Sequence, residues 1–349
     1  MLAHEWLTRG FEVDFVLLQE MGDLLEIVPV GARTVDLGVK RFRDAISPLR
    51  AYLRKNKPEV VLAAMWPLTV VAVIAIRLAG TGTRIVLSDH SILSRSYQHK
   101  GATHRAFLRA SMALTYRLAD VRVAVSKGVA ADVSALSGIR GDQFRVIYNP
   151  AATGKKYLDK KCPPPELENI RGPLILTVGA LKAEKDYMLL INAFSRLSPQ
   201  SDATLCILGE GVLRGELEQL VTRLGLQGRV LLPGFRVDTS SWYRHADLFV
   251  LSSKHEGFGN VIVEALEHGV PVVSTDCPAG PREILCDGKY GRLVSVGDAA
   301  ALAEAMLAAL SEIPDREAFK ARASDFSVSR IADEYLEVMR PVWRDVSNQ

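Results

Sequence analysis

Short apolar runs with the length of β-strands alternate with runs of helical periodicity along almost the whole chain. A first series reads "FEVDFVLL", "EVVLAAM", "TRIVLSDH", "VRVAVS" and "FRVIYN", and a second reads "LILTVG", "TLCILG", "RVLLPGF", "LFVLSS", "PVVST" and "GRLVSV". Alternation of this kind is typical of parallel sheets whose two faces are covered by helices. Two such series predict an α/β chain with two doubly wound domains.

The two series meet at a stretch rich in proline and lysine, which marks the expected domain boundary. It reads "NPAATGKKYLDKKCPPPELENIRGP" and gives a predicted linker over residues 151–172. Residues 1–150 then form the first domain and residues 173–326 the second. We expect a C-terminal helix within residues 327–349 to pack back on the first domain.

Composition is typical of a globular protein from a reducing compartment. Hydrophobic residues make up 48% and charged residues 24% of the 349 positions, which is enough apolar surface for sizeable cores. The four cysteines are scattered without CxxC spacing, as is usual in the cytosol. The seven histidines form no HExxH pattern and no aspartate lies in a DxD motif, so we expect neither a cofactor nor a bound metal.

One segment, residues 60–80, is apolar and long enough to raise the question of a membrane span. Pro67 and Thr69 break it, and Arg77 lies near its end. A buried strand over 59–65 followed by a helix over 68–79 accounts for the segment better. We also expect no signal peptide, and therefore a location in the cytoplasm or on the inner face of the cytoplasmic membrane.

Charge is divided unevenly between the two parts of the chain. Residues 1–150 hold 20 Lys and Arg against 13 Asp and Glu, a net +7, whereas residues 151–349 hold 23 against 27, a net −4. The most basic run interleaves cationic and aromatic side chains: Arg95, Lys100, Arg105, Arg109, Arg117, Arg122, Tyr97, Phe107 and Tyr116. Such a face suits anionic lipid headgroups, although an ordinary solvated helix face explains the same pattern.

The strand-to-helix loops of the second domain are the candidate ligand sites, because doubly wound sheets bind ligands beyond the carboxyl ends of their strands. The loop over residues 178–186 carries Lys182 and Lys185, which can meet a phosphate. The next loop places Gly209 and Gly211 as GxG. That pair lacks the third glycine of the dinucleotide fingerprint, and a tight turn explains it equally well.

A third loop, "SSKHEGFGN", joins the strand "LFVLSS" to the helical run "VIVEALEHG" and brings in two glutamates eight positions apart. Glycines let the backbone approach a ligand closely, and a helix start suits a phosphate. Glu264, about one turn inside the helix, can then reach a ribose hydroxyl, while Glu256 lies near the group attached to the phosphate. Either glutamate alone could be a surface carboxylate, but the pair with its glycines favours a binding site.

At these residues the sequence resembles a large family. "EGFGNVIVEALEHGVPVVST" is similar to the E-x7-E signature of retaining glycosyltransferases with the GT-B fold, the glycogen-synthase-like and mannosyltransferase-like superfamily. "VSKGVAADV", "VIYNP", "VGALKAEKDYMLLINAF", "LGEGVLRGELEQL" and "RVLLPGF" resemble its segments in the expected order, over nearly the whole chain. "DCPAGPREI" is similar to members that build bacterial surface polysaccharides. The resemblance implies two Rossmann-like domains facing across a cleft.

The resemblance also implies a role for each matching residue. Glu264 would bind the nucleotide ribose, and Lys185 would neutralise the diphosphate. Glu256, on the sugar hydroxyls, and His90, in "SDHS" at a strand end, would be the catalytic pair. The other expected nucleotide-sugar contacts are Gly179 and Gly209, the diphosphate loop Gly257, Phe258, Gly259, Asn260 and Val261, and the base loop Gly234, Phe235 and Arg236.

The chemistry fits these roles. Cleaving a sugar from a diphosphate leaves negative charge on the leaving group, which preorganised donors and a lysine can stabilise without a metal. Retention of the anomeric configuration is implied by the family alone. No residue stands out as a covalent nucleophile, so we expect a front-face mechanism.

Three departures from the family pattern affect these expectations. Ala180 stands where many relatives carry an arginine, so the phosphate clamp would rest on Lys185, helped by Lys182 or Arg282. Gly259 replaces a frequent proline. The chain also starts at the end of a first helix, where relatives begin with a strand and a glycine-rich loop. We therefore expect a well-folded second domain that binds nucleotide, an imperfect first domain, and poor sugar transfer.

The sequence thus predicts a retaining glycosyltransferase that moves a sugar from a nucleotide donor to a saccharide or polyprenyl-linked acceptor. A UDP-sugar is favoured over a GDP-sugar, and no nucleic acid is expected as a partner. The setting implied is bacterial lipopolysaccharide, capsule or exopolysaccharide synthesis. Two alternatives stay open: a nucleotide-sugar epimerase of the same architecture, and a non-catalytic subunit that binds nucleotide sugar or scaffolds a pathway.

Overall fold

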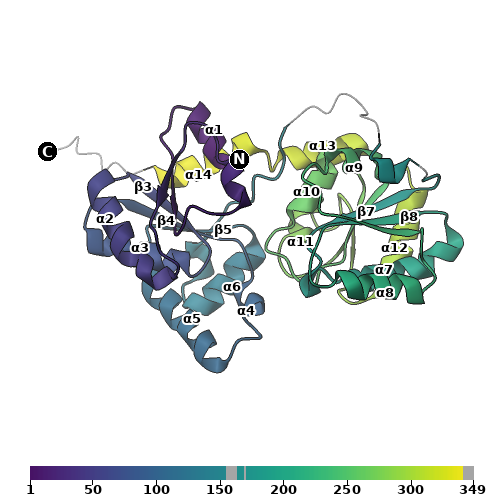
Figure 1. Cartoon of the computed structure of the whole chain (residues 1–349), viewed down its shortest axis with the longest axis horizontal. Helices are drawn as coiled ribbons and strands as arrows, with labels where there is room; N and C mark the ends of the chain where they lie inside the picture. Colours follow the sequence, from purple (N-terminus) through teal and green to yellow (C-terminus); the bar gives the residue numbers. More distant parts are fainter. Residues whose placement is uncertain (155–162, 169, 341–349) are drawn as a thin grey trace. The chain divides into compact units, whose positions relative to one another are not determined.

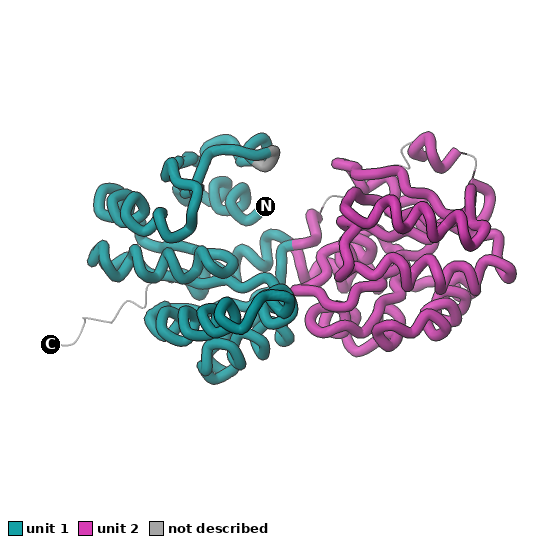
Figure 2. Tube along the Cα trace, turned by 60° about the horizontal axis from the view of Figure 1, so that its bottom comes forward, with its two compact units in different colours: residues 1–150, 328–349 teal, residues 151–327 magenta. Residues whose placement is uncertain are grey.

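The computed structural model describes residues 1–154, 163–168 and 170–340. They separate into two compact units (Figure 2): unit 1 contains Met1–Pro150 and the C-terminal segment from Val328, and unit 2 contains Ala151–Ser327. Both units are α/β with parallel sheets, as predicted. Residues 155–162 and 169 of the expected linker, and 341–349 of the expected C-terminal helix, lie outside the described part of the chain.

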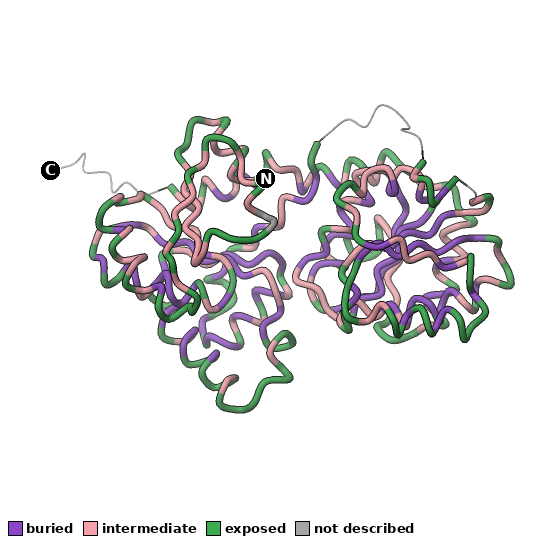
Figure 3. Tube along the Cα trace, in the orientation of Figure 1, coloured by how far each residue is buried: buried purple, intermediate pink, exposed green. Residues whose placement is uncertain are grey.

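Unit 2 is built on one six-stranded parallel sheet in the order β12-β11-β10-β7-β8-β9. Each strand falls within one of the apolar runs of the second series. The strands are β7 (Leu174–Val178), β8 (Thr204–Leu208), β9 (Val230–Gly234), β10 (Leu248–Leu251), β11 (Val272–Thr275) and β12 (Arg292–Val294). Its central strands are buried over almost their whole length (Figure 3), as expected when helices cover both faces.

Helices cover both faces of the unit 2 sheet (Figure 1). They are α7 (Tyr187–Leu197), α8 (Arg214–Arg223), α9 (Ser240–His245), α10 (Asn260–Glu267), α11 (Pro281–Ile284), α12 (Ala299–Ser311) and α13 (Arg316–Ser324). On one face α7, α8 and α12 share a core with the strands. On the other, α10 packs on β10, β11 and α13, and α9 packs on β7.

The strand order of unit 2 reverses at β7. From β7 the chain proceeds to β8 and β9 on one side, and it then returns to place β10 on the other side of β7. Such a reversal is the topological switch point, where loops leaving neighbouring strands diverge and open a ligand crevice. The loops after β7 and β10 therefore flank the position at which a ligand is expected.

Unit 1 contains a four-stranded parallel sheet in the order β3-β4-β5-β6, and a separate pair, β1 and β2. The strands are β1 (Asp14–Leu17), β2 (Arg33–Asp36), β3 (Val60–Ala64), β4 (Arg84–Asp89), β5 (Val121–Ala124) and β6 (Arg145–Val146). The helices are α1 (Leu2–Thr8), α2 (Ile46–Asn56), α3 (Leu68–Ala79), α4 (Leu93–Ser96), α5 (Ala102–Thr115), α6 (Lys127–Ser137) and α14 (Val328–Met339). On one face of the sheet, α14 packs against β4 and α1, and Ile331 and Tyr335 of α14 join its core.

The sheet of unit 1 is discontinuous. Within the described residues β1 pairs only with β2, and β3 pairs only with β4. Both β1 and β3 are half-buried along most of their length, whereas β7, β8 and β10 of unit 2 are buried. Each of β1 and β3 thus has one edge whose backbone groups find no strand partner in the described chain.

The apolar segment over residues 60–80 forms β3 and α3, which confirms the predicted strand and helix. A cis peptide bond between Trp66 and Pro67 separates the two elements. No helix within the described residues has the length and apolar character that crossing a bilayer would require.

Candidate active site

An ion pair joins the two loops that flank the switch point of unit 2. Lys185 ends the short 3-10 helix η6 (Ala183–Lys185) after β7, and its Nζ lies 2.7 Å from Oε1 of Glu256 in the loop after β10. Ser253 Oγ donates to the same carboxylate oxygen at 2.7 Å, and Ser252 Oγ donates to the Lys185 carbonyl at 2.7 Å. The Lys185 and Glu256 side chains are 21% and 12% exposed. The pair is thus shielded from bulk water while remaining within reach of a ligand.

Glycines let the loops after β7, β8 and β9 touch one another. The Gly179 amide donates to the Leu208 carbonyl at 2.9 Å, and the Gly209 amide donates to the Gly234 carbonyl at 3.0 Å. A Cβ on residue 209 would lie 2.0 Å from the Gly179 oxygen, and one on residue 179 would lie 2.8 Å from Oη of Tyr187. No side chain fits at either position, so backbone atoms alone form this edge of the site.

Packing within unit 2 holds the expected diphosphate loop, residues 257–261, in place. The Phe258 side chain is buried and meets the Phe326 ring edge-to-face at 5.4 Å. Gly280 approaches so closely that a Cβ there would lie 1.6 Å from the Phe258 oxygen. Gly259, at φ +105°, then turns the chain into α10 without a side-chain cap. At this helix start Gly257 and Val261 are half-buried and Asn260 is exposed, next to the positive end of the helix dipole.

Glu264 lies one turn inside α10, and a buried tyrosine of α9 holds its carboxylate. Tyr243 of α9 is 1% exposed and its Oη donates to Oε2 of Glu264 at 3.0 Å. The Tyr243 ring stacks on His268, with centroids 5.3 Å apart. Burial raises the pKa of the Glu264 carboxyl above its usual range. Glu264 is therefore a fixed, partly desolvated acceptor rather than a solvated surface carboxylate.

The residues of the expected base loop, and the two cations expected to help Lys185, differ in their exposure and in their salt-bridge partners. Phe235 is 67% exposed after β9, and Arg236 is paired with Glu166 at 2.5 Å. Arg282 is engaged by the carboxylates Asp276 and Asp287, and Lys182 is exposed. Among the three cations considered for the phosphate clamp, Lys185 is the one that the structure brings to Glu256.

His90 lies in unit 1, directly after β4, within a chain of hydroxyl groups. Its Nε2 is 3.0 Å from Ser88 Oγ, which is in turn 2.9 Å from Oη of Tyr335 on α14. Burial lowers the pKa of the imidazole, which favours the neutral ring at physiological pH. The hydroxyl groups of Ser88 and Tyr335 fix the orientation of the His90 ring, and Tyr335 belongs to the C-terminal helix α14.

Sequence reasoning missed the hydroxyl residues that support these groups. Ser253 lies close to Glu256 in "LFVLSSKHE", and Ser88 lies close to His90 in "SDHS". A polar residue at the end of a strand could therefore have indicated both of them. Tyr243 and Tyr335 lie 21 and 247 positions from the residues they contact, Glu264 and Ser88. No local pattern marks pairings at such separations.

Asp89, the last residue of β4, is 1% exposed, and only one of its two carboxylate oxygens has a hydrogen-bond partner in the described chain. Tyr116 Oη donates to its Oδ1 at 2.9 Å, whereas Oδ2 has no hydrogen-bond partner among the residues that the structure describes. Burial raises the pKa of this carboxyl to about 7. Since the unfolded chain has an aspartate pKa near ~3.9, the folded state binds the additional proton between these values.

We therefore expect the free energy of unfolding to fall as the pH rises from about 4 to about 7, where the buried carboxyl ionises. Asp89→Asn keeps the acceptor for Tyr116 without the charge, so it should flatten this part of the pH profile and raise Tm at pH 8. Urea unfolding of both proteins across this range measures the effect. Parallel profiles for the two proteins would contradict it.

Comparisons with known proteins agree with this architecture. Residues 1–155 match the family described as Glycosyltransferase Family 4, and residues 172–312 match Glycosyl transferases group 1. The chain is 32% identical over 269 residues, 75% of its length and 71% of the relative's, to an N-acetylgalactosaminyltransferase of Campylobacter jejuni that acts on N-acetylgalactosamine-N,N'-diacetylbacillosaminyl-diphospho-undecaprenol. It is 34% identical over 230 residues, 64% of its length and 65% of the relative's, to the lipopolysaccharide core glycosyltransferase LpsE of Rhizobium meliloti.

Solved structures share the fold over nearly the whole chain. Anabaena HepE, in complex with UDP-glucose, superimposes with a TM-score of 0.77 at 22% identity, covering 97% of this chain and 94% of HepE. WaaG, a glycosyltransferase involved in lipopolysaccharide biosynthesis, gives 0.71 at 19% identity with 97% and 94% coverage. The fold is that of the GT-B glycosyltransferases. The chain belongs to the group 1 glycosyltransferase family and is an enzyme of that class.

Proposed function

We propose that this enzyme is a retaining glycosyltransferase that moves a sugar from a nucleotide diphosphate donor to a saccharide or lipid-linked acceptor in bacterial polysaccharide synthesis. The observation that carries the proposal is the 2.7 Å pair of Lys185 and Glu256 at the switch point of unit 2. This pair lies between the β7 loop and the start of α10, and Glu264 follows one turn further along. Glu256, the start of α10 with Lys185, and Glu264 thus follow the order in which a donor presents its sugar, its diphosphate and its ribose.

The proposed chemistry uses each group once. In a front-face transfer the acceptor hydroxyl bonds to the anomeric carbon as the bond to the phosphate breaks, and its proton passes to the leaving phosphate. The developing negative charge falls on the diphosphate, where Lys185 and the start of α10 stabilise it. Glu256 holds sugar hydroxyls on the reacting face, and His90 contributes a neutral imidazole to the transfer step.

Two relatives support the choice of donor and acceptor. Anabaena HepE is described in complex with UDP and with UDP-glucose, which supports a UDP-sugar donor here. The Campylobacter jejuni relative acts on a diphospho-undecaprenol saccharide, which supports a polyprenyl-linked acceptor.

A transfer screen tests this function. The protein is incubated with UDP-sugars or GDP-sugars, with and without undecaprenyl-diphosphate-linked saccharides, in the presence and absence of EDTA. We expect a product that requires both donor and acceptor, retains the anomeric configuration and forms in EDTA. Isomerised sugar with the donor alone would establish the epimerase instead, and nucleotide binding without turnover would establish the non-catalytic subunit.

Membrane attachment is proposed through α5 of unit 1. Phe107, Leu114 and Leu118 are 61%, 72% and 47% exposed, and their spacing of seven and four residues places them along one side of the helix and its continuation. Arg105 and Arg109 are exposed beside this stripe. Exposed apolar groups flanked by cations are typical of surfaces that lie on anionic lipid.

The structure corrects the sequence prediction for two members of the basic run. Tyr116, expected on the same face, is fully buried and bonded to Thr69 and Asp89. Arg122 lies in β5, and its guanidinium donates to main-chain carbonyls. Tyr116 begins the 3-10 turn η3 (Tyr116–Leu118), and it lies four residues after Met112 and eight after Leu108, so it continues the buried side of α5.

We expect vesicles containing phosphatidylglycerol to sediment the protein at low salt and to release it at high salt, because salt screens surface attraction over a Debye length of ~10 Å at 0.1 M. The double variant Arg105→Glu, Arg109→Glu should abolish sedimentation. Arg43→Glu, Lys55→Glu makes the same charge change at exposed positions before and within α2 and should sediment normally. Equal sedimentation with neutral phosphatidylcholine vesicles would contradict the proposal.

A further inference from the structure

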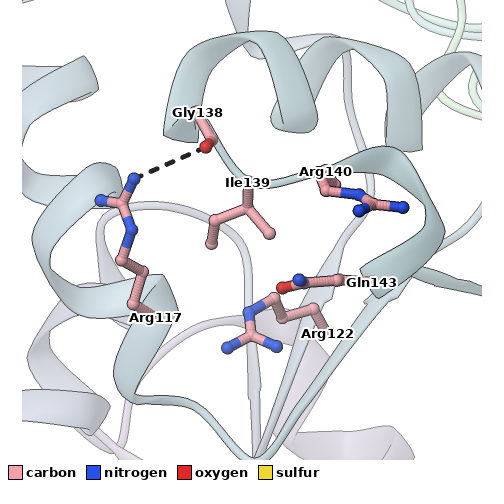
Figure 4. A pocket seen from close by; sticks show the side chains of 6 residues that line it. All are labelled: Arg117, Arg122, Gly138, Ile139, Arg140 and Gln143. Atoms are coloured by element: carbon pink, nitrogen blue, oxygen red, sulfur yellow. Dashed lines mark hydrogen bonds between the residues drawn. The ribbon is translucent and has the colours of Figure 1, made fainter.

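Two adjoining hollows open in unit 1 and are lined mainly by arginine. The first has a volume of about 330 Å³ and is lined by Arg117, Arg122, Gly138, Ile139, Arg140 and Gln143 (Figure 4). The second, of about 250 Å³, shares Arg122 and Gln143 with it and adds Arg84, Asp120, Val121, Arg145, Glu337 and Val338. The two hollows thus share lining residues and contain five arginines between them, and we call them together the arginine hollow.

The arginine hollow lies at the edge of the sheet where the strands begin. Arg84 and Arg145 are the first residues of β4 and β6, and Arg122 is the second residue of β5. These strands are parallel, whereas His90 follows the last residue of β4. With a rise of ~3.3 Å per residue, the six residues of β4 separate the two edges by roughly 20 Å. The hollow is therefore distinct from the part of unit 1 that carries the proposed catalytic histidine.

Main-chain carbonyls orient three of these guanidinium groups. Arg122 donates to the Tyr116 carbonyl at 2.6 Å and to the Ala119 carbonyl at 3.0 Å. Arg84 donates to the carbonyl of Val338 at 3.2 and 3.3 Å. Arg117 donates to the carbonyls of Ala113 and, at 3.5 Å, of Gly138 (Figure 4). Carbonyl partners hold a guanidinium in place without neutralising it, and of these three arginines Arg122 has a carboxylate, Asp120, near enough to interact with its charge.

The carboxylates around the hollow do not balance the arginines. Asp142 pairs with Arg140, and Glu337 lies 3.8 Å from Arg145. Asp120, the third carboxylate, accepts a main-chain N–H from Ile85 at 2.8 Å. Five guanidinium groups therefore face three carboxylates, a surplus of two positive charges. Arg117 and Arg122 form no salt bridge in the described chain, and both line the first hollow together with Ile139 (Figure 4).

Partial burial makes the charge of Arg122 costly. Burial lowers the pKa of the Arg122 guanidinium because that cation has lost part of its water, and the nearby Asp120 opposes this effect only in part. Charge-assisted hydrogen bonds to an anion are the interactions that would offset such a loss, and guanidinium groups present their donors in a fork that matches phosphate oxygens. The first hollow is at the lower end of the ~300–1,000 Å³ typical of small-molecule sites, a size that suits a phosphate or diphosphate group.

We propose that the arginine hollow binds a phosphate group between Arg117 and Arg122, with the Gln143 amide as a further donor. The phosphate can come from a soluble phosphoanhydride or from the headgroup of an anionic lipid. The second source has a structural basis as well, because Leu118, at the end of the exposed apolar stripe of α5, is the next residue after Arg117. In either case the site is separate from the donor site of unit 2.

Arginine footprinting tests the proposal and distinguishes the two sources. The full chain is labelled with phenylglyoxal alone, with inorganic pyrophosphate, or with phosphatidylcholine vesicles containing phosphatidic acid, always at matched ionic strength. Peptide mass spectrometry then gives the labelling rate of each arginine. We expect Arg117 and Arg122 to be protected severalfold, while exposed Arg43 is labelled at an unchanged rate. Protection by pyrophosphate identifies a soluble phosphate as a ligand, and protection by the vesicles alone identifies the lipid headgroup.

The proposal is overturned if neither probe protects these arginines, or if Arg43 is protected to the same degree. A binding measurement gives an independent answer. Calorimetric titration with pyrophosphate is performed in a Lys185→Ala background, which removes the proposed diphosphate contact of unit 2. Where pyrophosphate binds, Arg117→Gln should weaken it about tenfold, as expected for the loss of a charge-assisted hydrogen bond.

The matched control for this variant is Arg105→Gln, which removes one exposed arginine from α5 outside the hollow. It should leave pyrophosphate affinity unchanged, and an equal loss in both variants would show that net charge alone is responsible and overturn the proposal. Arg117 is exposed, so its replacement should preserve the fold, which circular dichroism and Tm verify. Arg122→Lys, which keeps the charge but loses the fork, should weaken binding in the same direction.

Discussion

Replacing Glu256 with alanine should lower kcat about a hundredfold or more, while the affinity for UDP stays within about twofold of wild type. The carboxylate is proposed to hold the sugar on its reacting face, so its loss acts on the transition state rather than on nucleotide binding. The substitution also releases Lys185 Nζ from its 2.7 Å ion pair, which leaves the lysine charge available to the diphosphate. Steady-state kinetics and calorimetry with UDP measure the two quantities separately.

Glu216→Ala is the matched control, because it removes an exposed glutamate from α8, away from the switch point. It should leave kcat unchanged. Unaltered turnover in Glu256→Ala would contradict the catalytic assignment and favour the non-catalytic subunit. His90→Ala should show the same pattern of reduced kcat and retained UDP affinity. Tyr335→Phe, which breaks the hydroxyl chain to His90, should give a smaller loss of the same kind.

The architecture was predictable because burial on both faces leaves a direct trace in sequence. Strands β7, β8 and β10 are apolar runs in the sequence, and each is followed directly by a glycine or a serine that begins a loop. The order of the strands left no such trace. That β10 lies beside β7, rather than beside β9, depends on contacts between segments some 70 residues apart, such as Phe249 with Leu176.

The candidate site was predictable in part for a related reason. Loops at the carboxyl ends of parallel strands must meet at one edge, so Lys185 and Glu256 were expected in the same region, and the structure brings them into contact. The ion pair of Lys185 with Glu256, and the hydrogen bond from Tyr243 to Glu264, depend on side-chain positions that only the folded structure shows. The placement of Tyr116 was wrong because the basic run was taken as one face, whereas the four-residue spacing of Leu108, Met112 and Tyr116 places this tyrosine on the buried side of α5.

Replacing Glu264 with alanine should weaken UDP binding tenfold or more, with a smaller effect on kcat, because a hydrogen bond to a charged acceptor contributes about 1.5–3 kcal/mol. The structure adds a dependence on pH. Burial raises the pKa of this carboxyl, so it takes up a proton at a higher pH than an exposed glutamate does. The protonated acid is a poorer acceptor for ribose hydroxyls, and UDP affinity should therefore fall as the pH decreases through that raised pKa.

Glu264→Gln separates the two parts of this prediction. The glutamine retains a carbonyl oxygen for the ribose and for Tyr243, but it cannot titrate. Its UDP affinity should therefore lie between those of wild type and Glu264→Ala, and it should lose the pH dependence attributed to the Glu264 carboxyl. Tyr243→Phe removes the hydroxyl that holds Oε2 at 3.0 Å and should weaken binding less than the loss of the carboxylate does. Calorimetry with UDP between pH 5 and pH 8 compares all four proteins. Identical affinities for wild type and Glu264→Ala would show that the ribose is held elsewhere, even if the enzyme transfers sugar as proposed.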